Sequence, residues 1–456
     1  MARSIDFTQG SIQRNLIAFA FPLFLGNLFQ QMYNAADSLI VGNYLGREAL
    51  AAVSSSSPLI NMMVGFFNGM AIGAGVIISR NFGARDQKGL DRAIHTDIAF
   101  SVVAGIFLTI AGSLFTPAIL SLMQTPEDIM PNSIEYFRIY CLGIIFSLLY
   151  NTCMGIMNAL GDSRHSLYYL IVSSITNVVL DILFVGYMGG GVGSAAFATI
   201  ISQALSVILS LRRLFRGQDG LYKVEIRKIR FHRQTLREIL RFGLPSGVQN
   251  SVIGIANLVV QTNINSFASA AVAGSGAYSK IEGFAFLPIT SFSLALTTCI
   301  GQNLGAKEYT RAKKSAVFGI FCSITMAELI GLAVFILAPV LISAFNSDPE
   351  VVAYGTRQCR IEGFFYCFLA LSHCIAGILR GAGKASIPML IMFGSWCALR
   401  VTYLTVVLHF YHHIEIVYSA YPLTWTVSSV IFIIYMFRAD WIHGLEKREK
   451  QRSVAV

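Results

Sequence analysis

The sequence has 456 residues, of which 55% are hydrophobic and only 13% are Asp, Glu, Lys or Arg. A water-soluble domain carries about a quarter charged residues, so this chain has too few to cover a surface of its size in water. Its mean hydropathy of +0.62 and its net charge of +10 therefore point to a basic protein that lies in lipid.

Twelve apolar segments are each long enough to cross the hydrocarbon as an α-helix, which takes about 20 residues. In chain order they are residues 15–40, 51–79, 94–116, 131–160, 167–187, 194–214, 239–265, 276–300, 317–342, 351–379, 387–407 and 418–437. Barrel strands are excluded because they are about 10 residues long and alternate in hydrophobicity. The first fifteen residues are polar and no small-residue cleavage site follows, so we expect a first span rather than a signal peptide.

The basic residues are distributed unevenly between the two sides of the predicted membrane topology. If the N-terminus is cytoplasmic, all but six of the 34 Lys and Arg lie on the cytoplasmic side; the exceptions are Arg47, Arg138, Lys280, Arg357, Arg360 and Arg400. This asymmetry predicts a multi-pass protein of the inner (plasma) membrane with both termini cytoplasmic. It also accounts for the net charge, so we expect the basic run 223–241 to rest against anionic membrane lipids and not to bind nucleic acid.

The two halves of the chain resemble each other at an offset near 222 residues. The loop Asn81-Phe82-Gly83-Ala84-Arg85 recurs as Asn303-Leu304-Gly305-Ala306-Lys307. Further pairs are Pro22 with Pro245, Pro117 with Pro339, Arg138 with Arg360, and Gly161 with Gly383. Shared landmarks of this kind indicate a tandem repeat.

Each half holds six spans, so both copies enter the membrane in the same orientation. The predicted fold is an all-α membrane protein with twelve transmembrane helices in two six-helix bundles, related by a pseudo-twofold axis along the membrane normal. The predicted domains are an N-terminal lobe (1–211), a basic cytoplasmic linker (212–238), a C-terminal lobe (239–437) and a cytoplasmic tail (438–456).

Several motifs resemble those of one transporter family. They are Gln30-Gln31-Met32-Tyr33-Asn34-Ala35-Ala36-Asp37 followed by Val41-Gly42 and Leu45-Gly46, the paired NxGA(R/K) loops, Gly161-Asp162, and the stretch GSAAFAT from Gly193 to Thr199. In this order the chain resembles the multidrug and toxic compound extrusion (MATE) family. The resemblance implies a two-lobe fold and drug export driven by Na+ or H+. No Walker motif is present, so ATP is not the expected energy source.

The N-terminal half contains a candidate cation site. Gln30, Asn34 and Asp37 share one helix face, as do Asn177 and Asp181, and such polar stripes must face protein or water. With Thr199 they would form a cluster of oxygen atoms, which suits a hard cation and equally suits a proton. In the DinF-like branch, which the chain most resembles, matching positions bind the cation; this implies that role for Asp37, Asn177, Asp181 and Thr199. The candidates for the substrate cavity in this half are Gln30, Asn34 and Asn158, which are not counted among the cation ligands.

The C-terminal half departs from the NorM-like branch, which has cation-binding acids on helices 7 and 10. The predicted helix 7 offers Gln249, Asn257 and Gln261 instead, and the deep part of helix 10 offers His373. A second cation site of that type is therefore not expected, and the helix 7 stripe is a candidate lining of the substrate path. On helix 8, Lys280 and Glu282 are expected to pair, or Glu282 to attract cationic substrate. We expect a structural role for Glu328.

Together with the candidate cation site, the resemblance to the MATE family implies a cation-coupled antiporter that exports amphipathic, often cationic small molecules by alternating access. No enzyme activity, cofactor or resident metal is expected beyond the coupling Na+ or H+, and a monomer in contact with membrane lipids is favoured. Alternatives on the same fold are a flippase for lipid-linked saccharides, which would need more deep Arg and Lys, and a narrow metabolite exporter. A membrane enzyme should show a compact His/Asp constellation, to which only His95-Thr96-Asp97 comes close.

Overall fold

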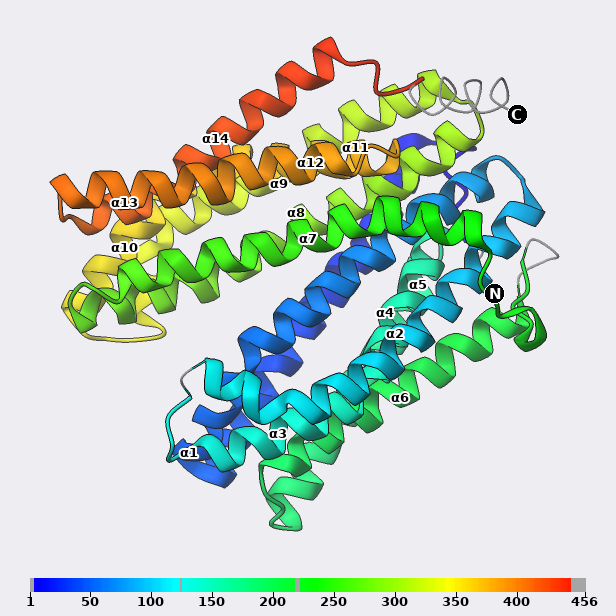
Figure 1. Cartoon of the computed structure of the whole chain (residues 1–456). Helices are drawn as coiled ribbons and strands as arrows, with labels where there is room; N and C mark the ends of the chain where they lie inside the picture. Colours follow the sequence, from blue (N-terminus) through cyan, green and yellow to red (C-terminus); the bar gives the residue numbers. More distant parts are fainter. Residues whose placement is uncertain (1–3, 124, 218–221, 444–456) are drawn as a thin grey trace. The chain divides into compact units, whose positions relative to one another are not determined.

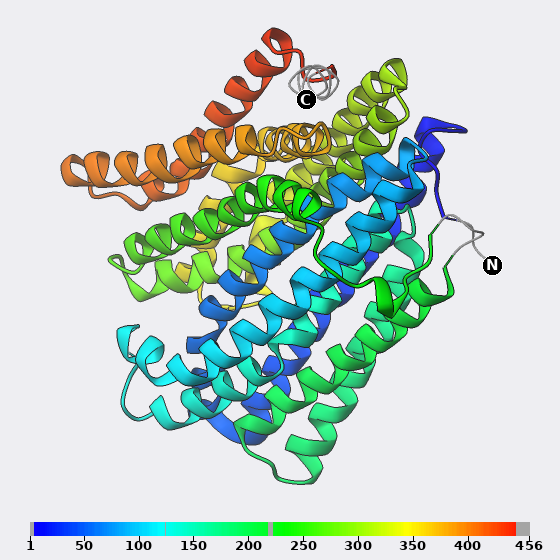
Figure 2. The same ribbon diagram turned by 45° about the vertical axis from the view of Figure 1, so that its right-hand side comes forward.

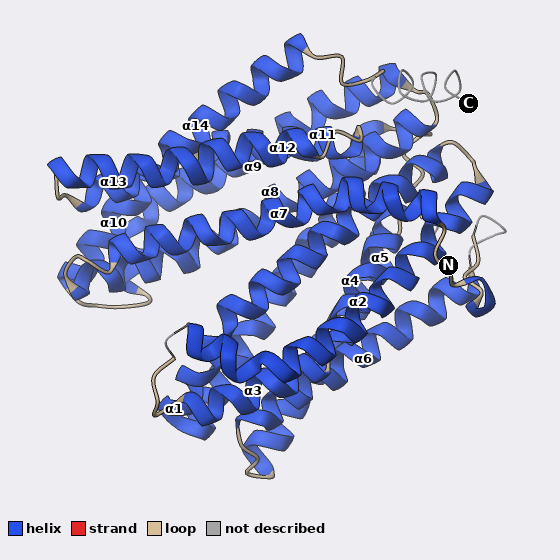
Figure 3. Ribbon diagram, viewed as in Figure 1, coloured by secondary structure: helices blue, strands red, loops and turns tan. Residues whose placement is uncertain are grey.

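The computed structural model describes residues 4–123, 125–217 and 222–443, and within these ranges the chain is helical with connecting loops and no strand (Figures 1 and 3). The chain divides into two compact units. Met1–Ile5 and Leu25–Gly247 form the N-terminal unit, and Asp6–Phe24 and Val248–Val456 form the C-terminal unit. Residues 444–456 of the predicted tail and 218–221 of the predicted linker lie outside the described residues.

The helices follow the apolar segments along the chain. The first half contains α1 (Ile12–Gly83), α2 (Gln87–Leu122), α3 (Met130–Leu142), α4 (Ile144–Ala159), α5 (Ser163–Asp181), the π-helical segment η1 (Ile182–Tyr187), α6 (Val192–Arg216) and the 3-10 turn η2 (Ile226–Lys228). The second half contains α7 (Arg233–Ile264), α8 (Ser269–Gly305), α9 (Tyr309–Ser343), α10 (Pro349–Gly363), α11 (Tyr366–Gly381), α12 (Ser386–Met392), the π-helical segment η3 (Phe393–Leu399), α13 (Arg400–Phe410) and α14 (Ile414–Arg438). Helices are the expected solution because every backbone polar group is satisfied within the segment.

Within each unit the helices pack side by side. In the N-terminal unit α2 packs against α3 and α4, and α6 packs against α3, α4 and α5. In the C-terminal unit α8 packs against α9, α10 and α11, and α14 packs against α10, α11 and α13. Figures 1 and 2 show the same neighbours from two directions. Each unit therefore has an interior of its own in which polar side chains find partners away from lipid.

The described helices account for the twelve predicted spans. Nine are long and apolar enough to cross a membrane, and two bent pairs, α3 with α4 and α10 with α11, each make one more. Here α1 contributes two spans, Ile12–Gly46 and Glu48–Gly83, which meet where Gly46 has φ +83° and ψ −171°. The remaining span is α7. No charged residue follows Arg241 in this helix, but polar residues such as Gln249, Asn257 and Gln261 make it less apolar than the other spans.

The internal repeat is visible in the backbone. Among the described non-glycine residues, only Arg85 (φ 57°) and Lys307 (φ 61°) have positive φ, and they occupy matching positions of the two NxGA(R/K) loops. The bends of the two broken spans also match, at 49° between α3 and α4 and 53° between α10 and α11. A non-glycine residue rarely takes this conformation, so its recurrence reflects a shared loop structure.

The linker between the halves is held against α2. The backbone N–H of Glu225 donates to His95 Nε2 (3.0 Å), and Thr96 Oγ1 lies 3.2 Å from His232 Nδ1. Burial and the nearby Arg230 and Arg92 lower the pKa of His232, while the Lys228 ammonium, 3.0 Å from Glu225, lowers the pKa of that carboxyl. His95 and Thr96 thus anchor a connecting segment, which explains them without a catalytic constellation.

Close helix packing in the N-terminal unit depends on glycine. A Cβ added at Gly73 would collide with the backbone of Gly243, and one added at Gly69 would collide with that of Gly247. The pairs Gly69/Gly73 and Gly243/Gly247 form small-xxx-small patterns on α1 and α7, which let helix backbones approach closely in membranes.

Replacing Gly73 with Ala should lower the free energy of unfolding by about 1–3 kcal/mol, because the methyl group forces two backbones apart. The matched control is Gly254→Ala in α7, where an added Cβ meets nothing within 4 Å. Because Ala has the better helix propensity, this substitution should leave the free energy of unfolding unchanged or raise it. Thermal unfolding of both purified variants in one detergent measures the effect. Equal midpoints for the two variants would contradict the close approach.

Candidate functional site

The two carboxylates predicted to bind a cation lie together in the N-terminal unit. Asp37 is on α1 and is half-buried, whereas Asp181 is the last residue of α5 and is 0% exposed. Their side chains are close enough to interact directly. The π-helical turn η1 begins immediately after Asp181, and such turns occur frequently at functional sites. The structure thus brings together two acids that are far apart in sequence.

Four oxygen atoms of this cluster lack hydrogen-bond donors. Among the described residues, none donates to Asp37 Oδ1, to Asp181 Oδ1 and Oδ2, or to Asn177 Oδ1, although all four atoms are buried. Neither acid forms an ion pair with a described basic side chain. Unsatisfied buried oxygens are costly and rare. Two interacting carboxylates, with the Asn177 amide one helical turn before Asp181, are oxygen ligands suited to a cation or to a shared proton.

The other predicted members of the cation site lie beside the acids. Asn177 is 1% exposed, and its Nδ2 donates to Thr199 Oγ1 at 3.4 Å. This bond turns the Asn177 amide so that its oxygen is the atom left without a donor. On α1, Gln30 and Asn34 are exposed.

Three tyrosines complete the surroundings of the acid pair, and the sequence analysis missed them. Tyr33 and Tyr136 both interact electrostatically with Asp37 and Asp181. Tyr140 interacts electrostatically with Tyr33. Tyr136 and Tyr140 are one helical turn apart on the buried face of α3, a spacing that indicates a shared face but not what the face contacts.

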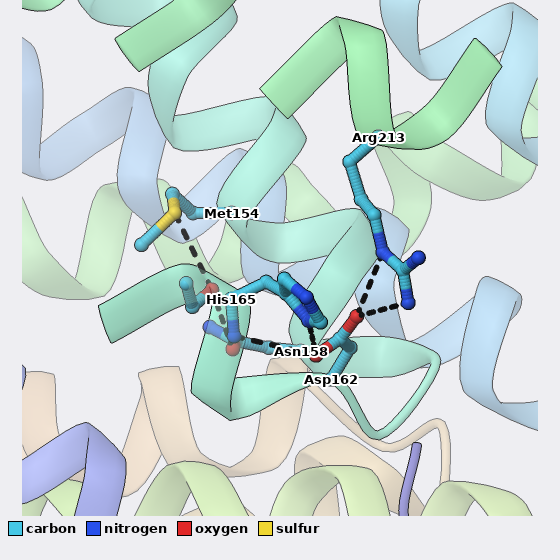
Figure 4. A network of polar contacts seen from close by, with 6 residues as sticks. Met154, Asn158, Asp162, His165 and Arg213 are labelled. Carbon is cyan, nitrogen blue, oxygen red and sulfur yellow. Dashed lines mark hydrogen bonds and ion pairs between the residues drawn. The ribbon is translucent and has the colours of Figure 1, made fainter. Parts of the chain in front are cut away.

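Asn158 lies in a different network, at the start of α5 (Figure 4). Its Oδ1 accepts from Ser166 at 3.0 Å. Nearby, Asp162 caps α5 and accepts hydrogen bonds from His165 Nδ1 (2.7 Å) and from Arg213 (3.3 Å). These partners are all satisfied locally, so the structure does not bring Asn158 to the acid pair.

The three polar residues of α7 have three separate environments in the C-terminal unit. Gln249 is 3% exposed, and its Nε2 lies 2.8 Å from the Met392 sulfur. Asn257 Oδ1 accepts from Arg400 at 3.0 Å. Gln261 is exposed and donates to Asn265 at 2.8 Å. They therefore do not share a common set of partners.

Helix α8 places its two charged residues apart. Lys280 is exposed and Glu282 is half-buried, and in the part of the chain that the structure describes they form no ion pair with each other. Residues two apart point to different helix faces, which explains the separation. On α9, Glu328 Oε2 accepts from the backbone N–H of Cys367 at 3.2 Å, so Glu328 caps the first turn of α11 where the span is bent.

The expectation that the deep part of helix 10 offers no acid is wrong. Glu362 is 0% exposed and accepts hydrogen bonds from Tyr278 (2.9 Å) and Gln358 (2.8 Å). It stands at the end of α10, but that end is a bend in the middle of a span that continues through α11.

Comparison with known proteins decides the family. The MatE family profile matches residues 22–183 and 245–404, once in each half. The chain belongs to the MatE family. Among its relatives, probable multidrug resistance protein YpnP of Bacillus subtilis (strain 168) is 29% identical over 84% of this chain and 85% of that protein, and YoeA of the same organism is 27% identical over 93% of each.

Solved structures agree with the two-bundle architecture of MATE transporters. A multidrug resistance MATE family transporter of the MOP superfamily in the outward-facing conformation covers 98% of this chain at a TM-score of 0.90 and 22% identity, over 99% of its own length. The predicted all-α, twelve-helix membrane fold is thereby confirmed. The protein is a multi-pass membrane transporter and not an enzyme.

Two of the buried aspartates of the N-terminal unit, Asp181 and Asp162, should respond differently to amidation. Asp181→Asn removes a carboxylate that accepts no described hydrogen bond, so the free energy of unfolding should stay within about 0.5 kcal/mol or rise. Asp162→Asn weakens bonds to His165 and Arg213 and should lower it by about 2–3 kcal/mol. Thermal unfolding in detergent compares them. A larger loss in Asp181→Asn would mean that Asp181 is a structural acid.

Proposed function

We propose that the protein is a cation-coupled antiporter that exports amphipathic, often cationic small molecules by alternating access, with Na+ or H+ as the coupling ion. The observation that carries this proposal is the Asp37/Asp181 pair, with buried carboxylate oxygens that no described donor satisfies. An acid buried in a membrane span costs about 2.5–3.5 kcal/mol on insertion scales. Two such acids side by side are retained where the transport cycle uses them.

The coupling ion would bind between α1, α5 and α6. Asp37 and Asp181 would supply charge, the Asn177 amide oxygen would be a neutral ligand, and Thr199 would orient that amide through its 3.4 Å hydrogen bond. The same oxygens accept a proton as readily, because neighbouring carboxylates raise one another's proton affinity. One charge entering down a potential of about 100 mV supplies about 2.3 kcal/mol, enough to drive export against a gradient of several tens-fold.

The substrate would use polar surface that the cation cluster leaves free. The exposed Gln30 and Asn34 on α1 and the exposed Gln261 on α7 are suited to line the path. Glu282 would attract cationic substrates. The remaining cavity candidates are Gln249, Asn257 and Asn158. Lys280 pairs with no described acid, and it would contact anionic groups or lipid headgroups.

The helices that connect the two units carry the means to bend. In α1 the chain passes from one unit to the other between Phe24 and Leu25, and in α7 between Gly247 and Val248. Each crossing lies two to three residues after a proline of the repeat, Pro22 or Pro245. Proline removes a helical hydrogen bond and permits a kink. Cation binding at Asp37 would favour one bend of α1 and release substrate.

The remaining assignments follow from charge and composition. We place the transporter in the inner (plasma) membrane with both termini cytoplasmic, because the basic residues collect on the cytoplasmic side. We also propose that it acts as a monomer. Lobes 1–211 and 239–437 joined by the linker 212–238 are the proposed functional division, with the tail 438–456 in the cytoplasm. Curated relatives named multidrug resistance proteins support drugs as substrates.

The test is ethidium efflux from proteoliposomes under a Na+ gradient and, separately, under a pH gradient. Wild-type efflux should follow one gradient and thereby name the ion. Asp37→Asn should reduce it at least ten-fold, because a neutral amide neither exchanges a proton nor supplies charge to Na+. The matched control is Asp86→Asn, an exposed cap of α2 that Asn replaces well; it should transport normally.

Efflux by Asp37→Asn at the wild-type rate would refute the coupling role of the pair. If folded wild type shows no gradient-dependent efflux of ethidium, the drug assignment fails, and a narrow metabolite exporter or a flippase for lipid-linked saccharides takes its place.

A further inference from the structure

The C-terminal unit contains a buried arginine that is held like a bound ligand. The Arg400 side chain is 1% exposed. Its Nη1 donates to Asn257 Oδ1 (3.0 Å) and its Nη2 to Thr424 Oγ1 (2.8 Å). The guanidinium also lies over the ring of Tyr421 at 4.5 Å and that of Trp396 at 5.6 Å. Neutral oxygens and aromatic faces therefore surround the cation on several sides.

Two carboxylates face this arginine from other helices. Glu362 on α10 and Glu282 on α8 both interact electrostatically with Arg400. Neither lies within the 4.0 Å of an ion pair. Glu362 is fixed instead by Tyr278 at 2.9 Å and by Gln358 at 2.8 Å. The acids thus lie close enough to interact with the guanidinium but do not clamp it in an ion pair.

Aromatic rings, carbonyl oxygen and carboxylates form the combination that recognises organic cations. Cations are attracted to the faces of Trp and Tyr, most strongly where water is excluded. A planar guanidinium both stacks on rings and donates several hydrogen bonds. The Arg400 Nε has no hydrogen-bond partner among the described residues. The hydrogen bonds of Arg400 are therefore made by Nη1 and Nη2 at the end of the side chain, and a free guanidinium could make the same bonds.

The position of the arginine relates it to the acid pair of the other half. Asn257 and Arg400 are 143 residues apart, within one residue of the separation of Asp37 and Asp181. The repeat offset of about 222 relates Asp37 to a position just after Asn257, and Asp181 to a position just after Arg400. Both differences are less than one helical turn. Both Asp181 and Arg400 adjoin a π-helical segment, η1 and η3 respectively. At these related positions the N-terminal half therefore carries two acids, Asp37 and Asp181, and the C-terminal half carries Asn257 and Arg400.

We propose that the cluster of Asn257, Trp396, Tyr421, Glu362 and Glu282 is a binding site for guanidinium-type organic cations that is filled by the chain's own Arg400. Because Arg400 occupies this site, the C-terminal unit binds no coupling ion there, and cation coupling falls to the Asp37/Asp181 pair. The last clause rests on the proposed function; the site itself does not.

Removing the arginine should open the site. Purified Arg400→Ala should bind about one [14C]guanidinium per chain, saturably, at millimolar or lower concentration, whereas wild type should bind none. Arg380→Ala is the matched control: Arg380 is also buried in the C-terminal unit, at 8% exposed, and donates to Ser293 Oγ (3.1 Å), but it contacts no described ring. It should bind none.

The acid and the ring supply the specificity of the expected binding. Adding Glu362→Gln or Tyr421→Leu to Arg400→Ala should weaken guanidinium binding at least ten-fold. Saturable binding by wild type, binding by Arg380→Ala equal to that of Arg400→Ala, or no binding by folded Arg400→Ala would each overturn the proposal. Binding is measured without any gradient, so its failure is distinguishable from failure of the antiport proposal, which efflux alone reports.

A second measurement serves if Arg400→Ala does not fold. The double variant Arg400→Ala/Glu362→Gln lacks both the cation and a facing charge, so it should unfold at a higher temperature than Arg400→Ala and recover at least half of the lost expression yield. Growth with millimolar guanidinium should likewise raise the yield of Arg400→Ala and not that of Arg380→Ala. If the two substitutions act additively and guanidinium changes neither yield, Arg400 is a packing residue and the proposal fails.

Discussion

The cost of leaving a polar group unmatched in hydrocarbon governs this structure. It makes every described span helical, since a helix satisfies its own backbone, and it requires a reason for each deep side chain that is charged or polar. Most such groups are satisfied locally: Asp162 by His165 and Arg213, and Glu328 by the backbone at the start of α11. The acids Asp37 and Asp181 differ from these groups, because their buried oxygens accept no hydrogen bond from a described donor.

The two halves meet this constraint differently on one scaffold. They share the positive-φ loop residues Arg85 and Lys307 and a bend of about 50° in one span of each half. At the centre of the N-terminal unit, however, two acids are left with bare oxygens, while in the C-terminal unit a buried arginine is saturated by amide, hydroxyl and aromatic partners. One repeated backbone thus carries two unsatisfied acids in the N-terminal unit and a hydrogen-bonded arginine in the C-terminal unit.

Departures from regular helix position the charged groups of both units. Asp181 is followed by η1, Arg400 is preceded by η3, and Glu362 stands at the bend between α10 and α11. Such departures free backbone groups and turn side chains toward the bundle interior. The tyrosines around each charge, Tyr33 and Tyr136 in one unit and Tyr278 and Tyr421 in the other, fill the interior with rings that carry a polar edge.

The sequence by itself determined the membrane location, the helical class, the repeat and the candidate acids Asp37 and Asp181, because hydropathy, charge and motif spacing are properties of neighbouring residues. Only the tertiary structure decided which side chains meet. It brought Asp37 next to Asp181, and it connected Asn158 at the end of α4 to Ser166 of α5. It also paired Asn257 with Arg400 and placed the buried Glu362 at the bend between α10 and α11. These outcomes depend on which helix faces pack together and where spans bend, and neither is encoded in the local pattern of residues.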